Sequence, residues 1–152
     1  SEIINLVKNA NRVFFIGRQF DSISSLEGAL KVKEISYKSA EGYPAGELKH
    51  GTLALIGNQT PVFVLSTDKN MHDKTMASAE EVHSRGGTIV LVAPNGFDKG
   101  CADFVIRIPE TERELAPILS VIPLQTIAFE TAKAMGLNPD KPRNLAKSVT
   151  VE

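Results

Sequence analysis

Cysteine is nearly absent from this chain of 152 residues, in which Cys101 stands alone. A single thiol excludes an internal disulfide bond and any zinc site that needs several cysteines, so a reducing cytoplasm is the expected setting. His72 and His83 lie eleven positions apart, and neither pairs with His50 or Cys101 at the spacing that metal ligands use. We therefore predict no metal site.

Long apolar runs and an excess of charge are also missing. No stretch reaches the roughly 18 apolar residues of a membrane-spanning helix, and the opening SEIINLVKNANR has no long apolar core. The net charge is -1, with lysines and glutamates interspersed. Such a surface offers no patch for polyanions or membranes, so we expect no nucleic-acid partner and no membrane partner.

The chain does contain enough apolar residues, 42%, to form the core of one domain. Four short runs rich in β-branched and aromatic residues are typical of strands. The first three are apolar nearly throughout, as a parallel sheet covered on both faces requires. These runs are residues 12–17, 61–66, 88–93 and 104–109.

Helical patterns alternate with these strands, at residues 22–41 and 70–85. The alternation predicts an α/β fold: a three-layer αβα, doubly wound sheet of about five parallel strands in flavodoxin-like order. A short edge strand near residues 40–43 would be the fifth.

A third helical pattern, residues 112–135, is apolar on almost every side, and Pro123 should kink it. One sheet cannot cover all those sides, so this helix either forms a subunit or domain interface or is an ordinary central helix. The residues after Gly136 are polar and punctuated by proline. We therefore expect a domain at residues 1–138 and a C-terminal tail at 139–152.

The first long helix carries a narrow stripe of charge formed by Glu27, Lys31, Glu34 and Lys38, with apolar residues around most of the rest. One interpretation is a solvated ladder of i, i+4 pairs, each contributing about 0.3–0.5 kcal/mol. The other is a nearly buried helix whose polar stripe faces a crevice, where a carboxylate beside lysines serves as an acid or base.

Three further candidates each have a plain structural alternative. His50 is followed by Gly51 on permissive backbone that lets another chain or a ligand approach, although lone histidines are commonly surface residues. Residues 17–25, GRQFDSISS, follow the first strand and could bind an anion or simply cap the helix. Lys147 is either a solvated lysine or, in a tail folded into an apolar cleft, an amine nucleophile.

Two segments carry a resemblance to a known family: residues 26–51, LEGALKVKEISYKSAEGYPAGELKHG, and residues 141–152, KPRNLAKSVTVE. Together they resemble the C-terminal sugar isomerase (SIS) domains of glutamine–fructose-6-phosphate amidotransferases, the glucosamine-6-phosphate synthases. The likeness spans essentially the whole chain. It implies an enzyme that makes glucosamine 6-phosphate from fructose 6-phosphate and ammonia of glutamine, without a metal or redox cofactor.

The resemblance also implies roles for individual residues. Glu34 would be the base that moves a proton between C1 and C2 of the sugar, with Lys31 assisting. His50 would open the sugar ring in the active site of the neighbouring subunit of a homodimer. Lys147 would form an imine with the ketose, the Ala146 backbone would lie beside the sugar, and the tail would close the site.

Two departures from the family pattern limit what this chain does alone. It begins with Ser1 where the family's glutaminase domain has a nucleophilic cysteine, and it contains no second sugar isomerase copy. We therefore expect upstream SIS and glutaminase domains as partners and no full turnover by the isolated chain. The alternatives are a non-catalytic module that binds sugar phosphates and a deglycase that acts on sugar-phosphate amine adducts.

Overall fold

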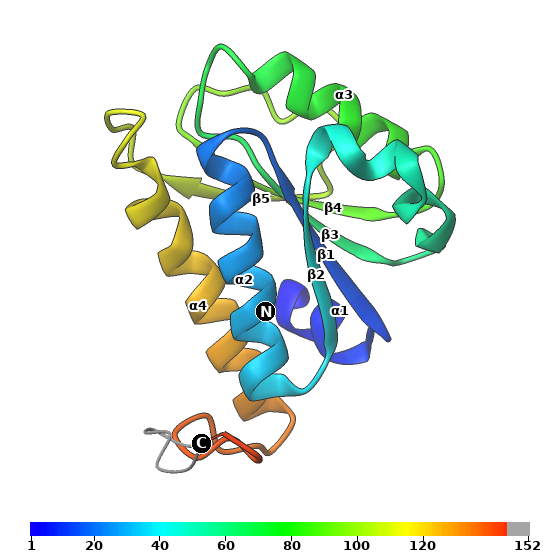
Figure 1. The fold of residues 1–152 in the computed structure, drawn as a ribbon, viewed down its shortest axis with the longest axis vertical. Helices are drawn as coiled ribbons and strands as arrows, with labels where there is room; N and C mark the ends of the chain where they lie inside the picture. Colours follow the sequence, from blue (N-terminus) through cyan, green and yellow to red (C-terminus); the bar gives the residue numbers. More distant parts are fainter. Residues whose placement is uncertain (146–152) are drawn as a thin grey trace, which may run out of the picture.

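The computed structural model describes residues 1–145 of the chain. They form a five-stranded sheet with helices on both faces (Figure 1). The elements, in chain order, are α1 (Glu2–Asn9), β1 (Arg12–Gly17), α2 (Phe20–Ser36), β2 (Ser39–Pro44), the 3₁₀ helices η1 (Ala45–His50) and η2 (Thr52–Leu55), β3 (Pro61–Leu65), α3 (His72–His83), β4 (Thr88–Pro94), β5 (Phe104–Ile108) and α4 (Ala116–Ala134).

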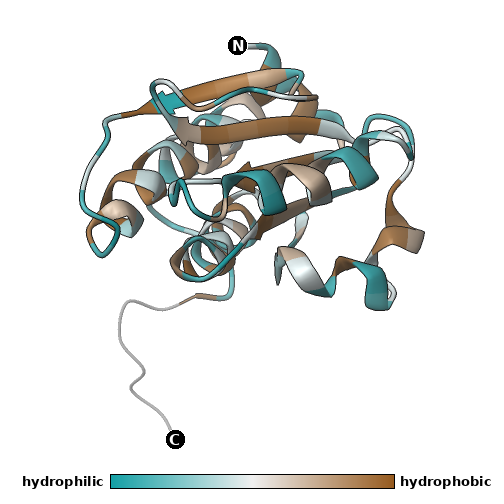
Figure 2. Cartoon of the chain, turned by 90° about the horizontal axis from the view of Figure 1, so that it is seen from above, coloured by the Kyte–Doolittle hydropathy of each residue, from teal (hydrophilic) through white to brown (hydrophobic). Residues whose placement is uncertain are grey.

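The strand order is β2-β1-β3-β4-β5, and every neighbouring pair is parallel. The predicted doubly wound fold, its flavodoxin-like order and the edge strand β2 are therefore confirmed. β3 is buried at every position, as is β1 after Arg12, because helices cover both faces of the sheet. Figure 2 shows these hydrophobic strands lying between the helices.

Alternate residues of each strand supply two cores. On one face, Phe15 stacks on Phe63 with ring centroids 4.7 Å apart, beneath α1, α2 and α4. On the other face, Phe14 and Ile16 pack with residues of α3 and η1. Gly28 lets α2 approach closely, because a Cβ there would lie 2.6 Å from Cδ1 of Leu124 on α4. The result is the predicted three-layer arrangement.

The helix limits differ from the prediction at several ends. α2 ends at Ser36 rather than residue 41, because Tyr37 adopts a left-handed conformation (φ 59°) and the chain then enters β2. α4 begins at Ala116, not at residue 112, and runs through Pro123. The short helix α1 was not predicted, although Ile3, Ile4 and Val7 follow a helical spacing that could have indicated it. Within residues 1–145, no helix is long and apolar enough to cross a membrane.

Candidate active site

The predicted charged stripe on α2 is present as a three-residue cluster. The Lys31 ammonium lies 2.8 Å from Oε2 of Glu34 and 3.4 Å from Oε1 of Glu27. Chiefly through the hydrogen bond to Glu34, this arrangement raises the pKa of Lys31, so the ammonium stays charged at neutral pH. About 30% of the Glu34 side chain is exposed, so the carboxylate is accessible to a ligand while it remains oriented by Lys31.

Lys38 does not belong to this cluster, contrary to the prediction. The helix ends before Lys38, whose ammonium donates a hydrogen bond to the backbone carbonyl of Ala10 at 2.9 Å. The expected Glu34–Lys38 pair therefore gives way to a Lys31–Glu34 pair at spacing i, i+3.

The surroundings of α2 also differ from the prediction that the helix is nearly buried. Ile23, Leu26 and Leu30 are 60%, 55% and 42% exposed in this chain. The helix packs on the sheet through its small face, which includes Ser25, Ala29 and Val32, and this leaves the larger side chains outside. The apolar residues of a helix do not show, from sequence alone, whether the residues that bury them belong to the same chain or to another.

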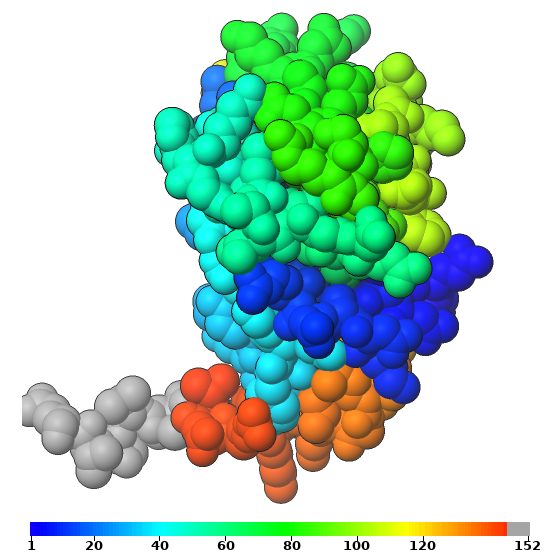
Figure 3. Space-filling view, turned by 90° about the vertical axis from the view of Figure 1, so that its right-hand side faces the viewer, coloured from blue at the N-terminus to red at the C-terminus, as the bar shows by residue number. Residues whose placement is uncertain are grey.

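Glu34 nevertheless lines a cavity of about 430 Å³. The cavity lies between the carboxyl-terminal part of α2 and the start of the tail, with Leu30 and Tyr37 on one side and Arg143 and Leu145 on the other. Figure 3 shows the tail residues, in red, against the lower end of α2. The structure thus places the root of the tail beside the candidate base, while Ala146 and Lys147 lie outside the described residues.

His50 is distant in the fold from this cavity. It is the last residue of η1, its side chain is 74% exposed, and Nε2 lies 4.0 Å from Oε2 of Glu47. η1 follows the carboxyl end of β2 and packs in the layer of α3, whereas Glu34 lies in the opposite layer (Figure 1). Gly51, with φ 137°, supplies the permissive backbone that was expected beside His50. His50 does not line the cavity beside Glu34.

The GRQFDSISS loop does not present its serines to a ligand. Ser24 and Ser25 are buried, and the Ser22 and Ser25 hydroxyls donate to the backbone carbonyls of Gln19 and Asp21. α2 begins without a side-chain cap hydrogen bond, so the alternative role as an N-cap is not seen either. Ser24 and Ser25 are instead packed inside the domain, and Ser22 bonds to the backbone at the surface.

Asp21, from the same loop, is a feature that the sequence analysis missed. Its buried carboxylate accepts hydrogen bonds from the Thr67 backbone N–H at 2.8 Å and the Thr67 hydroxyl at 2.7 Å. The protein's own carboxylate thus joins the carboxyl ends of β1 and β3, where doubly wound folds commonly bind anionic ligands. The sequence offers one local indication of this role, which is the position of an acidic residue in the first turn of a helix.

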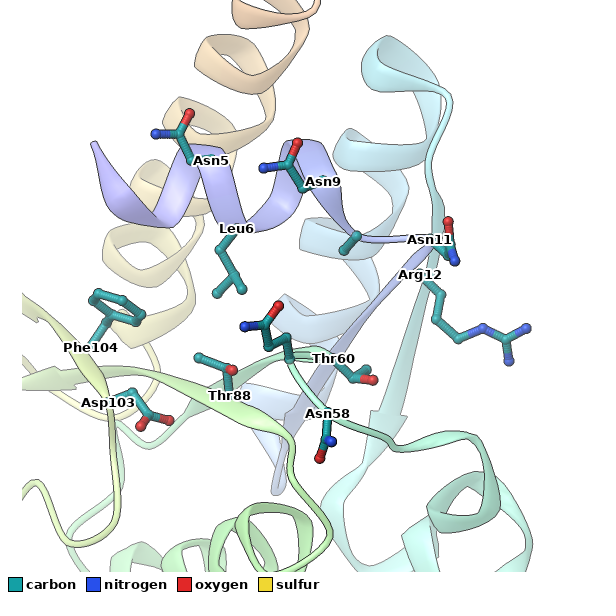
Figure 4. Close-up of a pocket in the computed structure, with 12 residues that line it drawn as sticks. Asn5, Leu6, Asn9, Asn11, Arg12, Asn58, Thr60, Thr88, Asp103 and Phe104 are labelled. Carbon is teal, nitrogen blue, oxygen red and sulfur yellow. The ribbon is translucent and has the colours of Figure 1, made fainter.

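A larger hollow, about 600 Å³, lies at the amino ends of the strands (Figure 4). Carboxamides such as Asn9, Asn11 and Asn58 line it together with Leu6 and Phe104. It contains no lysine, histidine or glutamate among its lining residues, and its one carboxylate, Asp103, accepts from the Ile89 backbone N–H at 2.7 Å. This lining offers no acid–base pair comparable with Lys31 and Glu34.

The parallel sheet and its two layers of helices define a doubly wound α/β domain, with the Lys31–Glu34 ion pair beside a cavity, and comparison with known proteins identifies its family. The SIS domain model matches residues 6–135, so the chain belongs to the SIS domain family. More particularly, the chain is similar to the C-terminal SIS domain of the isomerizing glutamine–fructose-6-phosphate aminotransferases.

Two such relatives carry this similarity. The aminotransferase of Caldanaerobacter subterraneus is 50% identical over 146 residues, which is 95% of this chain and 24% of the relative. The solved C-terminal domain of the Francisella tularensis enzyme superposes with a TM-score of 0.87 at 34% identity, covering 93% of this chain and 40% of that one. A glucosamine-6-phosphate deaminase from Thermotoga maritima superposes with a TM-score of 0.74 at 26% identity, covering 97% and 44%. The chain thus spans about a quarter of the length of the curated relatives it matches.

Proposed function

We propose that this chain is the isomerase part of an enzyme that converts fructose 6-phosphate and glutamine-derived ammonia to glucosamine 6-phosphate. The observation that carries the proposal is the Glu34 carboxylate, held 2.8 Å from a charged Lys31 in a cavity bounded by the root of the tail. Similarity to isomerizing aminotransferases over 95% of the chain supports the same reaction.

The chemistry follows from these groups and the proposed nucleophile. The amine of Lys147 attacks the C2 carbonyl of the open ketose and water leaves, which forms an imine. Ammonia then displaces the lysine amine. Glu34 removes a proton from C1 as the imine nitrogen gains one, which gives an enolamine. Glu34 then returns a proton to C2 as the C1 hydroxyl loses its own, so that the C2 imine becomes an amine and the C1 hydroxyl becomes a carbonyl. The oxidation at C1 balances the reduction at C2, and no external electron carrier is needed.

Lys31, His50 and Ala146 have supporting roles in this scheme. The ammonium of Lys31 orients Glu34 and stabilises negative charge that develops on the sugar oxygens during proton transfer. His50 opens the ring of the sugar bound to the other subunit of a homodimer, a role that fits its 74% exposed side chain. The Ala146 backbone lies beside the bound sugar as the tail closes the site.

The phosphate of the sugar needs a binding site from outside this chain. At the start of α2, Ser24 and Ser25 are buried, and the Asp21 carboxylate would repel an anion. The curated relatives are about four times as long as the chain, and we assign phosphate binding to an upstream SIS domain and ammonia supply to a glutaminase domain. The assembly acts in the cytoplasm.

A borohydride trapping experiment tests the proposed imine. The full-length enzyme is incubated with fructose 6-phosphate, reduced, and mapped by peptide mass spectrometry. We expect a sugar adduct on Lys147, loss of that adduct in Lys147→Arg, and normal trapping in the matched tail variant Lys141→Arg. An adduct on another lysine, with Lys147 unmodified, rejects the assignment.

The deaminase-like fold favours a second candidate, in which the same site releases ammonia from an amino sugar phosphate. The two functions differ in direction and in their need for glutamine. Ammonia release from glucosamine 6-phosphate, with no product from fructose 6-phosphate and glutamine, would favour the second candidate over the first.

A further inference from the structure

We infer that Tyr37 and Arg143 form a clamp that fixes the root of the C-terminal tail, residues 143–145, beside the cavity of Glu34. The inference rests on the proposed function of that site and assigns two positioning residues to it. The contact between them could not be recognised from local sequence patterns, because the two residues lie 106 positions apart in the chain.

Two different contacts make the clamp. The Tyr37 hydroxyl accepts a hydrogen bond from the Arg143 backbone N–H at 2.9 Å. The Arg143 guanidinium carbon lies 4.2 Å from the centroid of the Tyr37 ring, which is close enough for a cation–π contact. Main chain and side chain of Arg143 are therefore both held by one tyrosine, so its position and its direction are restricted together.

The clamp is placed where it can control the site. Tyr37 follows the last turn of α2, three residues after Glu34, and its hydroxyl faces the tail at Arg143. Tyr37, Arg143 and Leu145 line the same cavity as Glu34. The clamp therefore holds the root of the tail at the edge of the cavity that Glu34 lines.

The remaining described part of the tail has little other attachment. Its other hydrogen bonds within residues 139–145 are local, from Asp140 and Lys141 to Asn138. Within the part of the chain that the structure describes, the bond between Tyr37 and Arg143 is the hydrogen bond that ties the tail to the sheet domain. Loss of this bond should therefore release the tail without disturbing the sheet.

The experiment compares Tyr37→Phe, Tyr37→Leu and Arg143→Gln in the full-length enzyme, with Tyr43→Phe as the matched control at the chain's other tyrosine. Two quantities are measured: the rate of borohydride-trapped adduct formation on Lys147, and, in separate samples without sugar, the initial rate of tryptic cleavage after Lys147. Substrate affinity is measured separately, because a positioning residue should change kcat more than sugar binding.

We expect Tyr37→Phe, which loses the hydrogen bond but keeps the ring, to slow trapping about three- to tenfold and to speed cleavage correspondingly. Tyr37→Leu, which loses both contacts, should have a larger effect, and Arg143→Gln, which keeps the backbone N–H, a smaller one. Tyr43→Phe should match the wild type, and the melting temperature should stay nearly constant across the series.

Unchanged trapping and cleavage in both Tyr37 variants would overturn the clamp, as would slower trapping with unchanged cleavage. A wild-type enzyme that gives no adduct on Lys147 would instead overturn the proposed function, so the two failures are distinguishable.

Discussion

At the scale of single residues, Asp21 is an ionisable group that is almost completely buried. Its side chain is 2% exposed, and burial raises the pKa of this carboxyl above its ordinary value of 3.8, although Thr67 donates two hydrogen bonds to it. Burial outweighs the hydrogen bonds because they compensate only part of the lost hydration. The carboxylate therefore links the carboxyl ends of β1 and β3, but its burial in the charged form lowers the free energy of unfolding by an amount that depends on pH.

The raised pKa predicts how stability depends on pH. Between pH 3.8 and the folded pKa, the folded chain binds the Asp21 proton more tightly than the unfolded chain does. The contribution of Asp21 is therefore most favourable below pH 3.8 and is lost as the pH rises through the folded pKa. Asp21→Asn can keep both contacts with Thr67 without a buried charge, so we expect a flatter stability profile across this range and no loss of stability at pH 7.

Urea unfolding of the wild type and Asp21→Asn at several pH values measures this difference. Asp21→Ala serves as the control for the hydrogen bonds, because it leaves the Thr67 N–H without its acceptor and should cost about 1–3 kcal/mol. Parallel stability profiles for the wild type and Asp21→Asn would show that the pKa of Asp21 is not raised.

Residue-scale features were predictable only where they depend on positions close in sequence. Helix periodicity placed Lys31 and Glu34 on one stripe, although the pairs expected there were Glu27–Lys31 and Glu34–Lys38, and the Lys31–Glu34 pair at i, i+3 was not expected. The contacts of Asp21 with Thr67 and of Tyr37 with Arg143 join residues 46 and 106 positions apart. No periodicity encodes such contacts, because they depend on how the elements pack.

At the scale of elements, the strands were easier to predict than the limits and surroundings of the helices. A strand covered on both faces needs an uninterrupted apolar run, and β1 and β3 have one. The end of α2 was misplaced because Tyr37 takes a left-handed conformation that glycine usually marks. The degree of burial of α2 was misjudged because Ile23, Leu26 and Leu30 remain exposed within residues 1–145.

The uncovered surface extends over two neighbouring helices. Ile23, Leu26 and Leu30 of α2 are joined by Ile118 and Ile122 of α4, which are 62% and 53% exposed. Figure 1 shows the two helices side by side on one face of the sheet. Single exposed apolar residues are common, whereas such a group on adjacent helices marks an interaction surface. We propose that the preceding SIS domain of the full-length enzyme covers it.

Substituting lysine for an exposed apolar residue of α2 or α4 tests whether another domain covers this surface. In the isolated chain, Ile118→Lys should change the free energy of unfolding by no more than about 0.5 kcal/mol, because the side chain is exposed. In the full-length enzyme, the same lysine would be buried and should lower stability by about 2 kcal/mol or more. Leu55→Lys, at an exposed residue of η2 away from this surface, is the matched control. Equal effects of Ile118→Lys in the two proteins would contradict the proposal.

At the scale of the whole molecule, the sheet separates the proposed catalytic residues. Glu34 lies on the layer of α1, α2 and α4, near the amino ends of the strands, because α2 runs back along the sheet from the carboxyl end of β1. His50 lies beyond the carboxyl end of β2, in the layer of α3. If both residues serve one site, as proposed, Glu34 of one copy of the chain must work together with His50 of another copy.

Complementation between two inactive full-length variants tests this shared site most directly. Glu34→Gln and His50→Ala should each abolish formation of glucosamine 6-phosphate alone. In mixed dimers, one of the two sites contains both native residues, so random mixing of equal amounts should restore about a quarter of the wild-type activity. If mixed dimers form but no activity returns, or if Glu34→Gln alone still exchanges the C1 proton with solvent, the account is contradicted.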